Sequence, residues 1–122
     1  IATLGIKNVS QEDYSNTNRI KIVLDKENFA LYFSRSPLPN FANFSGDPFE
    51  FYPFLRHIGL YAFRSETLRE LVKLEPTKLE KIESLEQLRW LFNDYKIQII
   101  ETQIETPNID VPEDVAKVIS LL

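Results

Sequence analysis

The sequence contains no cysteine, no methionine and a single histidine, His57. The absence of cysteine excludes disulfides, thiolate chemistry and a zinc site with cysteine ligands, and one histidine excludes a metal site built from several histidines. A chain without cysteine is typical of a reducing compartment. Translation begins with methionine, so its absence even at position 1 predicts that these 122 residues belong to a longer or processed chain.

The sequence also lacks a long apolar run and an excess of positive charge. No stretch approaches the roughly 20 apolar residues of a membrane-spanning helix, and no basic-then-apolar signal segment opens the chain. Lysine and arginine total 14 against 18 aspartate and glutamate residues, which gives a net charge of -4. This balance provides no electrostatic footprint for nucleic acid or an anionic membrane, so a phosphate-bearing ligand would need local cations or a metal ion.

The composition that remains is that of one folded unit. Hydrophobic residues make up 43% and charged residues 26% of the chain, values that exclude a disordered or collagen-like protein. No repeat, low-complexity tract or linker divides residues 1–122.

Apolar and β-branched runs predict four strands, of which the first two form a hairpin. The runs Arg19–Leu24 and Phe29–Ser34 flank a short polar turn, which favours a hairpin. His57–Arg64 and Lys96–Thr102 are the other two strand candidates. The first 18 residues are polar and weakly patterned, and no strand is predicted there.

Helix signals occupy the second half of the chain. Ser65 is placed to cap a helix through about Leu74, and Thr77 and Glu80 have the spacing of a capping box that opens a helix to about Asn93. Pro112 suits the first turn of a final helix. Strands that alternate with helices predict an α/β layered fold.

Residues 36–53 form a long aromatic loop. They hold four of the seven prolines, which remove hydrogen-bond donors from a strand ladder. Loops of this length in compact domains are usually functional or form interfaces. We therefore expect the loop to pack against something, such as a second subunit, through its aromatic side chains Phe41, Phe44, Phe49, Phe51 and Tyr52.

The predicted helix of residues 77–93 carries two charges within its apolar stripe. Ile82, Leu85, Leu88 and Phe92 share one face at helical spacing, and Glu86 and Arg89 project into the same sector. Charges on a core-facing stripe need partners. Either Glu86 and Arg89 form an internal ion pair, or a polar ligand approaches this face, where Glu86 and Gln87 would bind its hydroxyl groups.

Three further places in the chain could bind a polar ligand or a cation. His57 and Tyr61 are four residues apart on a strand pattern and share a face, although a lone histidine on a strand can also be purely structural. Arg35 ends a strand just before the loop, where its guanidinium could bind a carboxylate through two parallel hydrogen bonds. Asp110, ahead of the final helix, could either bind a hard cation such as Mg²⁺ or complement the helix dipole.

Several segments, in order, resemble one family. Residues 30–39 (ALYFSRSPLP), 56–64 (RHIGLYAFR), 85–89 (LEQLR) and 109–115 (IDVPEDV) are similar to the 3-deoxy-manno-octulosonate cytidylyltransferases, or CMP-Kdo synthetases. Residues 2–4 and 18–23 also fit, so the resemblance covers essentially the whole chain. It covers only the C-terminal half of the family's pattern, because the nucleotide-binding loop with its Pro-Ala-Arg and Leu-Pro-Gly-Lys segments is absent.

The resemblance implies a fold, a reaction and a set of site residues. The fold would be the C-terminal half of a nucleotidyltransferase-type, Rossmann-like three-layer fold with a mixed sheet and a dimerisation hairpin or loop. The reaction would be CTP plus Kdo giving CMP-Kdo and diphosphate with Mg²⁺, in a cytoplasmic homodimer that serves lipopolysaccharide biosynthesis. Asp110 would be the catalytic carboxylate that ligates Mg²⁺. The sugar-acid site would comprise Arg35, His57, Tyr61, Glu86 and Gln87.

The chain departs from the family pattern near the metal carboxylate. The family usually has Gly-Val-Asp-Thr-Pro-Glu-Asp, where this chain has Asn108 and Val111 in place of the glycine and threonine. Valine cannot cap a helix as threonine does, a loss of about 1 kcal/mol. Two other functions remain open from the residues: transfer of CMP to another sugar acid, such as a sialic acid or amino-Kdo, and a non-catalytic dimeric scaffold. The isolated chain is expected to be inactive because the CTP-binding half is missing.

Overall fold

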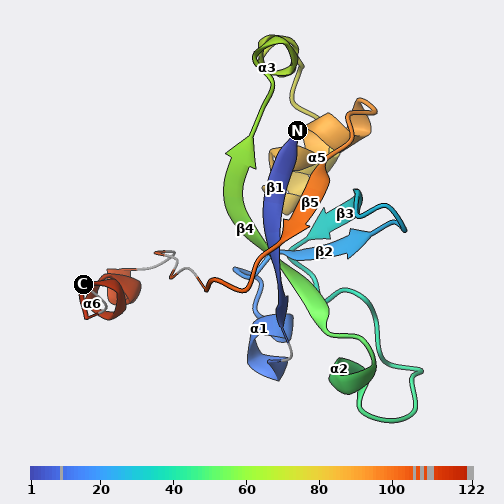
Figure 1. Ribbon diagram of the computed structural model, residues 1–122, viewed down its shortest axis with the longest axis vertical. Coiled ribbons are helices and arrows are strands. Elements are labelled where there is room, and N and C mark those ends of the chain that lie inside the picture. The colour runs from blue at the N-terminus through green and yellow to red at the C-terminus, as the bar shows by residue number, and fades with distance from the viewer. Residues whose placement is uncertain (9, 106, 108, 110–111, 121–122) are drawn as a thin grey trace.

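The computed structural model describes residues 1–8, 10–105, 107, 109 and 112–120. These residues form a five-stranded mixed sheet with short helices (Figure 1). The elements are β1 (Ala2–Asn8), α1 (Gln11–Ser15), β2 (Lys21–Leu24), β3 (Ala30–Ser34), α2 (Pro48–Phe51), β4 (Phe54–Ala62), α3 (Ser65–Leu71), α4 (Lys78–Glu83), α5 (Gln87–Phe92), β5 (Gln98–Glu101) and α6 (Pro112–Ile119).

The strand order is β3-β2-β4-β1-β5, and only the β1–β5 pair is parallel. The predicted hairpin is confirmed, because β2 and β3 pair antiparallel around a turn in which Asn28 has a φ of 62°. The mixed α/β sheet that the sequence predicted is likewise present.

The first strand was missed by the sequence analysis. Residues assigned no regular structure form β1, which lies between β4 and β5 in the sheet (Figure 1). Gly5 is essential to this position: a Cβ there would lie 2.9 Å from the Leu55 Cγ atom and 3.0 Å from the Ile99 Cγ2 atom. The polar Thr3 is 2% exposed, and its hydroxyl is satisfied by hydrogen bonds to carbonyl groups of β4.

The hydrophobic core lies between one face of the sheet and the α4–α5 segment. It contains Phe33 and Leu55 from the strands and Leu88 and Trp90 from α5. On β4 and β5, Leu60 and Ile100 remain exposed and line a shallow hollow with Leu4. The helix α6 lies away from the sheet (Figure 1).

The short helices α1 and α2 were not predicted, and the helices that follow β4 differ from the prediction in two further places. Ser65 does not cap α3, since Arg64 occupies the N-cap position and no side chain bonds there. The helix predicted for residues 77–93 is divided, because Ser84 adopts a left-handed conformation with φ of 55° and ends α4. Ile82 and Phe92 therefore point to solvent, at 82% and 67% exposure, while Leu85 and Leu88 enter the core.

The aromatic loop packs mainly against its own chain. Tyr14 of α1 stacks on Phe41 and contacts Phe49 and Phe54, with ring centroids 5.1 to 5.5 Å apart. Phe51, by contrast, is 75% exposed and so is available to a second surface. No helix within the described ranges is long and apolar enough to cross a membrane.

Candidate functional site

Arg35 is held in one orientation at the end of β3. Its Nε donates to the Glu83 carbonyl at 2.8 Å, its Nη2 to the Ser84 carbonyl at 3.3 Å and its Nη1 to the Thr17 carbonyl at 3.1 Å. A guanidinium has five N–H groups, so one remains on each terminal nitrogen. Two such donors on a fixed guanidinium are what bidentate binding of a carboxylate requires.

Glu83 secures the same strand end with its carboxylate. It accepts from the Ser34 hydroxyl at 2.6 Å, from the Arg35 backbone N–H at 3.0 Å and from the Tyr32 hydroxyl at 3.3 Å. Burial alone would raise the pKa of Glu83, but these hydrogen bonds hold its pKa below the usual value. The sequence analysis did not identify Glu83. The available signal was the pair of hydroxyls on Tyr32 and Ser34, which share one strand face and need an acceptor.

Glu86 and Gln87 stand at the start of α5. Glu86 is the N-cap residue and is exposed, while Gln87 is only 5% exposed. The Gln87 amide makes no hydrogen bond with any of the described residues. The amide is not among the buried polar atoms without a partner, so its donors and acceptor reach solvent and are available to a ligand. The Ser84 carbonyl that binds Arg35 lies just ahead of both residues in the chain.

Of the two alternatives for Glu86 and Arg89, the internal ion pair is not formed. Arg89 instead donates from Nε to Glu80 at 2.8 Å and from Nη2 to the same carboxylate at 2.5 Å. Its Nη1 reaches the Leu74 carbonyl at 3.1 Å. This arrangement arises because the break at Ser84 turns α5 relative to α4. The Glu86 carboxylate is thereby left without an ion pair among the described residues.

His57 lies in the interior of β4, where its ring contacts Thr3 of β1. Its Nε2 lies 2.9 Å from the Thr3 hydroxyl oxygen, and that hydroxyl donates toward the Leu60 carbonyl at 2.8 Å. Whether Nε2 donates to this hydroxyl or accepts from it depends on the tautomer of the ring. Burial lowers the pKa of His57 to about 4, so the ring is neutral at neutral pH.

Tyr61 connects His57 to α5. Its ring lies 5.4 Å from the His57 ring and 5.3 Å from the Trp90 ring, measured between centroids. The prediction that His57 and Tyr61 share a face is confirmed by this contact, although the β1–β4 register shifts between Thr3 and Leu4. Burial raises the pKa of the Tyr61 hydroxyl, and the nearby Glu86 carboxylate raises it further.

The predicted sugar-acid residues thus lie around the start of α5, although they are not all in direct contact. Tyr61 is near Glu86 and touches His57, and Arg35 is tied to the turn before α5. Among the described contacts, none joins Arg35 to His57 or Tyr61. Asp110, the predicted Mg²⁺ ligand, lies outside the described residues. Within the part of the chain that is described, no three histidine or acidic side chains gather as a metal site.

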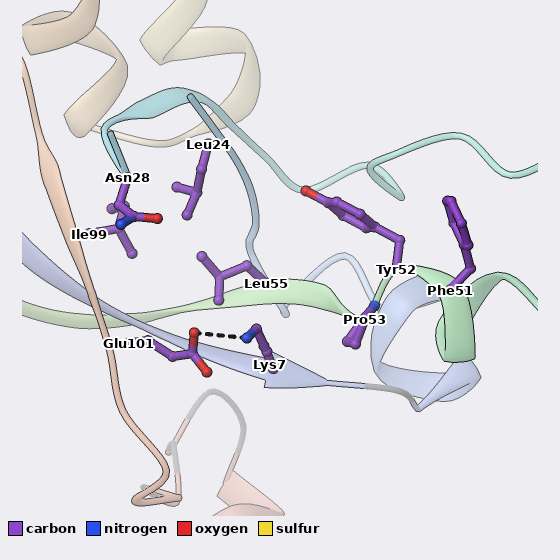
Figure 2. Close-up of a pocket in the computed structure, with 9 residues that line it drawn as sticks. All are labelled: Lys7, Leu24, Asn28, Phe51, Tyr52, Pro53, Leu55, Ile99 and Glu101. Atoms are coloured by element: carbon purple, nitrogen blue, oxygen red, sulfur yellow. Dashed lines mark ion pairs between the residues drawn. The ribbon is translucent and has the colours of Figure 1, made fainter. Parts of the chain in front are cut away.

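A separate hollow of about 290 Å³ lies at the far end of β1 and β5 (Figure 2). Leu24, Leu55 and Ile99 provide apolar walls, and Lys7 Nζ pairs with Glu101 Oε2 at 3.1 Å. None of the predicted site residues lines it, so it is distinct from the candidate site.

The sequence of the chain also matches a known protein family. The family model described as cytidylyltransferase matches residues 1–99. The chain belongs to the cytidylyltransferase family. This confirms the resemblance that the sequence segments indicated, and it explains the mixed sheet of a nucleotidyltransferase-like fold.

Individual members of the family are similar along the whole chain. The 3-deoxy-manno-octulosonate cytidylyltransferase of Porphyromonas gingivalis is 44% identical over 126 residues, covering 100% of this chain and 50% of that protein. The protein of the same name from Geotalea daltonii is 41% identical over 128 residues, covering 100% and 51%. The chain therefore spans about half the length of these cytidylyltransferases.

A solved structure supports the same assignment of fold. It is described as CMP:2-keto-3-deoxy-manno-octonic acid synthetase complexed with CTP, and it superposes with a TM-score of 0.85 at 34% sequence identity. The match covers 98% of this chain and 47% of that one. The arrangement of the five strands is therefore that of a cytidylyltransferase.

Proposed function

We propose that the chain is the sugar-acid-binding and dimerisation half of an enzyme that transfers CMP from CTP to 3-deoxy-manno-octulosonate (Kdo) and releases diphosphate. Membership in the cytidylyltransferase family and the names of its relatives support the reaction class. The observation that carries the sugar-acid assignment is the Arg35 guanidinium, which three carbonyl groups orient while one N–H stays available on each terminal nitrogen.

Each site residue has a role that its surroundings support. Arg35 binds the carboxylate of the sugar acid through its two available N–H groups. Glu86 and Gln87 bind hydroxyl groups at the start of α5. Within the described structure Gln87 makes no side-chain hydrogen bond although the residue is 5% exposed, and Glu86 has no ion pair. Neutral His57 and the Tyr61 hydroxyl form the β4 wall, since burial disfavours the charged form of both.

The reaction itself depends chiefly on positioning and charge neutralisation. The 2-hydroxyl of the bound sugar acid attacks the α-phosphorus of CTP, and diphosphate leaves. By holding the carboxylate and the hydroxyls, the residues around α5 orient that 2-hydroxyl. We propose Asp110 as one carboxylate that holds Mg²⁺, because a hard oxygen ligand is what this cation prefers, and the ion would neutralise phosphate charge.

The proposal extends to assembly and location. A homodimer would form through the aromatic loop, on which Phe44, Phe51 and Tyr52 remain exposed. We place the enzyme in the cytoplasm, where the chain's lack of cysteine suits a reducing medium and where its product would enter lipopolysaccharide biosynthesis.

The test is a substitution of Arg35 in the complete gene product. Arg35→Lys keeps the charge but loses the paired donors, and we expect the KM for Kdo to rise at least tenfold while the KM for CTP changes less than twofold. Arg69→Lys, on the exposed surface of α3, is the matched control and should leave both values unchanged.

A panel of sugar acids completes this test. Turnover with Kdo but not with a sialic acid or amino-Kdo supports the proposal, and the reverse preference assigns a different sugar acid. A folded dimer that turns over none of them, and binds none, would leave the scaffold function as the explanation.

A further inference from the structure

Two segments far apart in sequence meet at the Glu83 carboxylate. Tyr32, Ser34 and the Arg35 backbone come from β3 and its end, while Glu83 is the last residue of α4. One side chain therefore accepts three hydrogen bonds across a gap of about 50 positions. No other carboxylate in the described structure connects β3 to the α4–α5 segment.

Arg35 donates to this segment from both its backbone and its side chain. The carboxylate of Glu83 accepts from the Arg35 backbone, and the carbonyl of Glu83 accepts from the Arg35 side chain. The next carbonyl, at Ser84, accepts from Nη2. Arg35 is thus bound at its backbone and at its guanidinium by the same two residues, which removes rotamer freedom from a long side chain.

Lys21 reinforces this arrangement from β2. It is fully buried, and its Nζ donates to the Arg35 carbonyl at 2.7 Å and to the Asn16 carbonyl at 2.9 Å. The ammonium group and the Glu83 carboxylate attract one another. The end of β3 is consequently fixed by a buried cation on one side and by Glu83 on the other.

We propose that Glu83 is a positioning residue for the sugar-acid site: it holds the end of β3 and the Ser84 turn together, and so fixes the Arg35 donor pair relative to Glu86 and Gln87. The identity of the ligand rests on the proposed function. In this proposal Glu83 acts through Arg35 and not on the substrate, since three of the roughly four acceptor sites of its carboxylate are taken by Ser34, Tyr32 and the Arg35 N–H.

The kinetic test uses Glu83→Gln in the complete gene product. Glutamine has nearly the same shape but only one acceptor oxygen and no charge, so at least one of the three hydrogen bonds is lost. We expect the KM for Kdo to rise five- to twentyfold, with kcat and the KM for CTP changed less than twofold. Glu70→Gln is the matched control, because it removes an exposed carboxylate that accepts from Tyr95 and does not touch β3.

A double variant separates positioning from a general loss of stability. If Glu83 acts through Arg35, the combination of Glu83→Gln with Arg35→Lys should raise the KM for Kdo little more than Arg35→Lys alone. Fold-changes that multiply in the double variant would overturn the proposal. A fall in kcat that matches a loss of folded protein, with the KM for Kdo unchanged, would also overturn it.

A measurement without substrate keeps this proposal distinct from the proposed function. In Glu83→Gln the amide hydrogen of Arg35 should exchange at least tenfold faster, while that of Ile99, which donates to the Asn28 carbonyl, should not change. If the wild-type protein turns over no sugar acid, the proposed function fails, and the exchange rate still decides the anchoring role of Glu83. An unchanged Arg35 exchange rate contradicts that role in either case.

Discussion

His57 is kept neutral by its place in the structure. Its side chain is enclosed between Phe33 and Tyr61, with ring centroids 5.1 and 5.4 Å away, and its Nε2 bonds to Thr3. Protonation would place a charge in this apolar environment, which is why its pKa falls from 6.5 to about 4. A neutral imidazole can donate to or accept from a hydroxyl group, but it adds no charge to the site.

This shift predicts how stability depends on pH. Between about pH 6.5 and 4 the unfolded chain binds a proton at His57 that the folded chain does not, so the free energy of unfolding falls as the pH falls through this range. The loss amounts to about 3 kcal/mol and is absent above pH 7. In urea unfolding measured from pH 7.5 to 4, the free energy of unfolding of the wild type should fall relative to that of His57→Phe as the pH falls. Parallel curves would contradict the shifted pKa.

Sequence reasoning named residues of the candidate site but not the contacts that support them. Arg35, His57 and Gln87 were identified because their residue types and strand or helix positions suit a polar ligand. Glu83 was missed because its role depends on β3 and α4 meeting, which no local pattern reveals. The alternative of a Glu86–Arg89 ion pair rested on one continuous helix, which the break at Ser84 interrupts.

At the scale of elements, short sequence signals predicted the features that are formed by residues close together in the chain. The β2–β3 hairpin and the Thr77–Glu80 capping box both depend on residues within a few positions of each other, and both are present. The break at Ser84 was not predictable in this way, since neither glycine nor proline marks it. Its left-handed conformation is supported from outside the helix, by Arg35 donating to the Ser84 carbonyl.

The strand β1 was likewise not predictable from its local sequence pattern. Thr3, Gly5 and Lys7 alternate on one face and read as polar or neutral, which is atypical of a central strand. Pairing with β4 on one side and β5 on the other buries Thr3 and Gly5. Because those partners lie far away in sequence, the position of β1 follows from tertiary pairing rather than from its own pattern.

The two expected helix caps give a direct comparison. Thr77 accepts from the Glu80 backbone at 3.2 Å, and Glu80 accepts from the Thr77 backbone at 3.1 Å, whereas Ser65 makes no capping bond. Thr77→Ala should therefore lower the free energy of unfolding by about 1 kcal/mol. Ser65→Ala, an exposed change outside a cap, should stay within about 0.5 kcal/mol of the wild type. Urea unfolding at pH 7 measures both, and equal losses would contradict these assignments.

At the scale of the whole molecule, the chain presents apolar surface on several elements. Leu60 and Ile100 are 63% and 52% exposed on the sheet, and Phe51 is 75% exposed at the aromatic loop. Exposed apolar groups that gather in patches mark surfaces for further protein contacts. The chain also spans about half the length of the relatives that it matches.

This leads to a prediction for the 122 residues on their own. The proposed reaction needs a site for the cytidine and triphosphate of CTP, and the candidate residues around α5 provide only carboxylate and hydroxyl binding. We expect the purified chain to form no CMP-Kdo from CTP, Kdo and Mg²⁺, whereas the complete gene product forms it under the same conditions. Product is measured by chromatography, with the folded state of the chain checked by circular dichroism. Turnover by the isolated chain would show that a triphosphate site lies within these 122 residues. The proposal that they form only the sugar-acid-binding half of the enzyme would then be wrong.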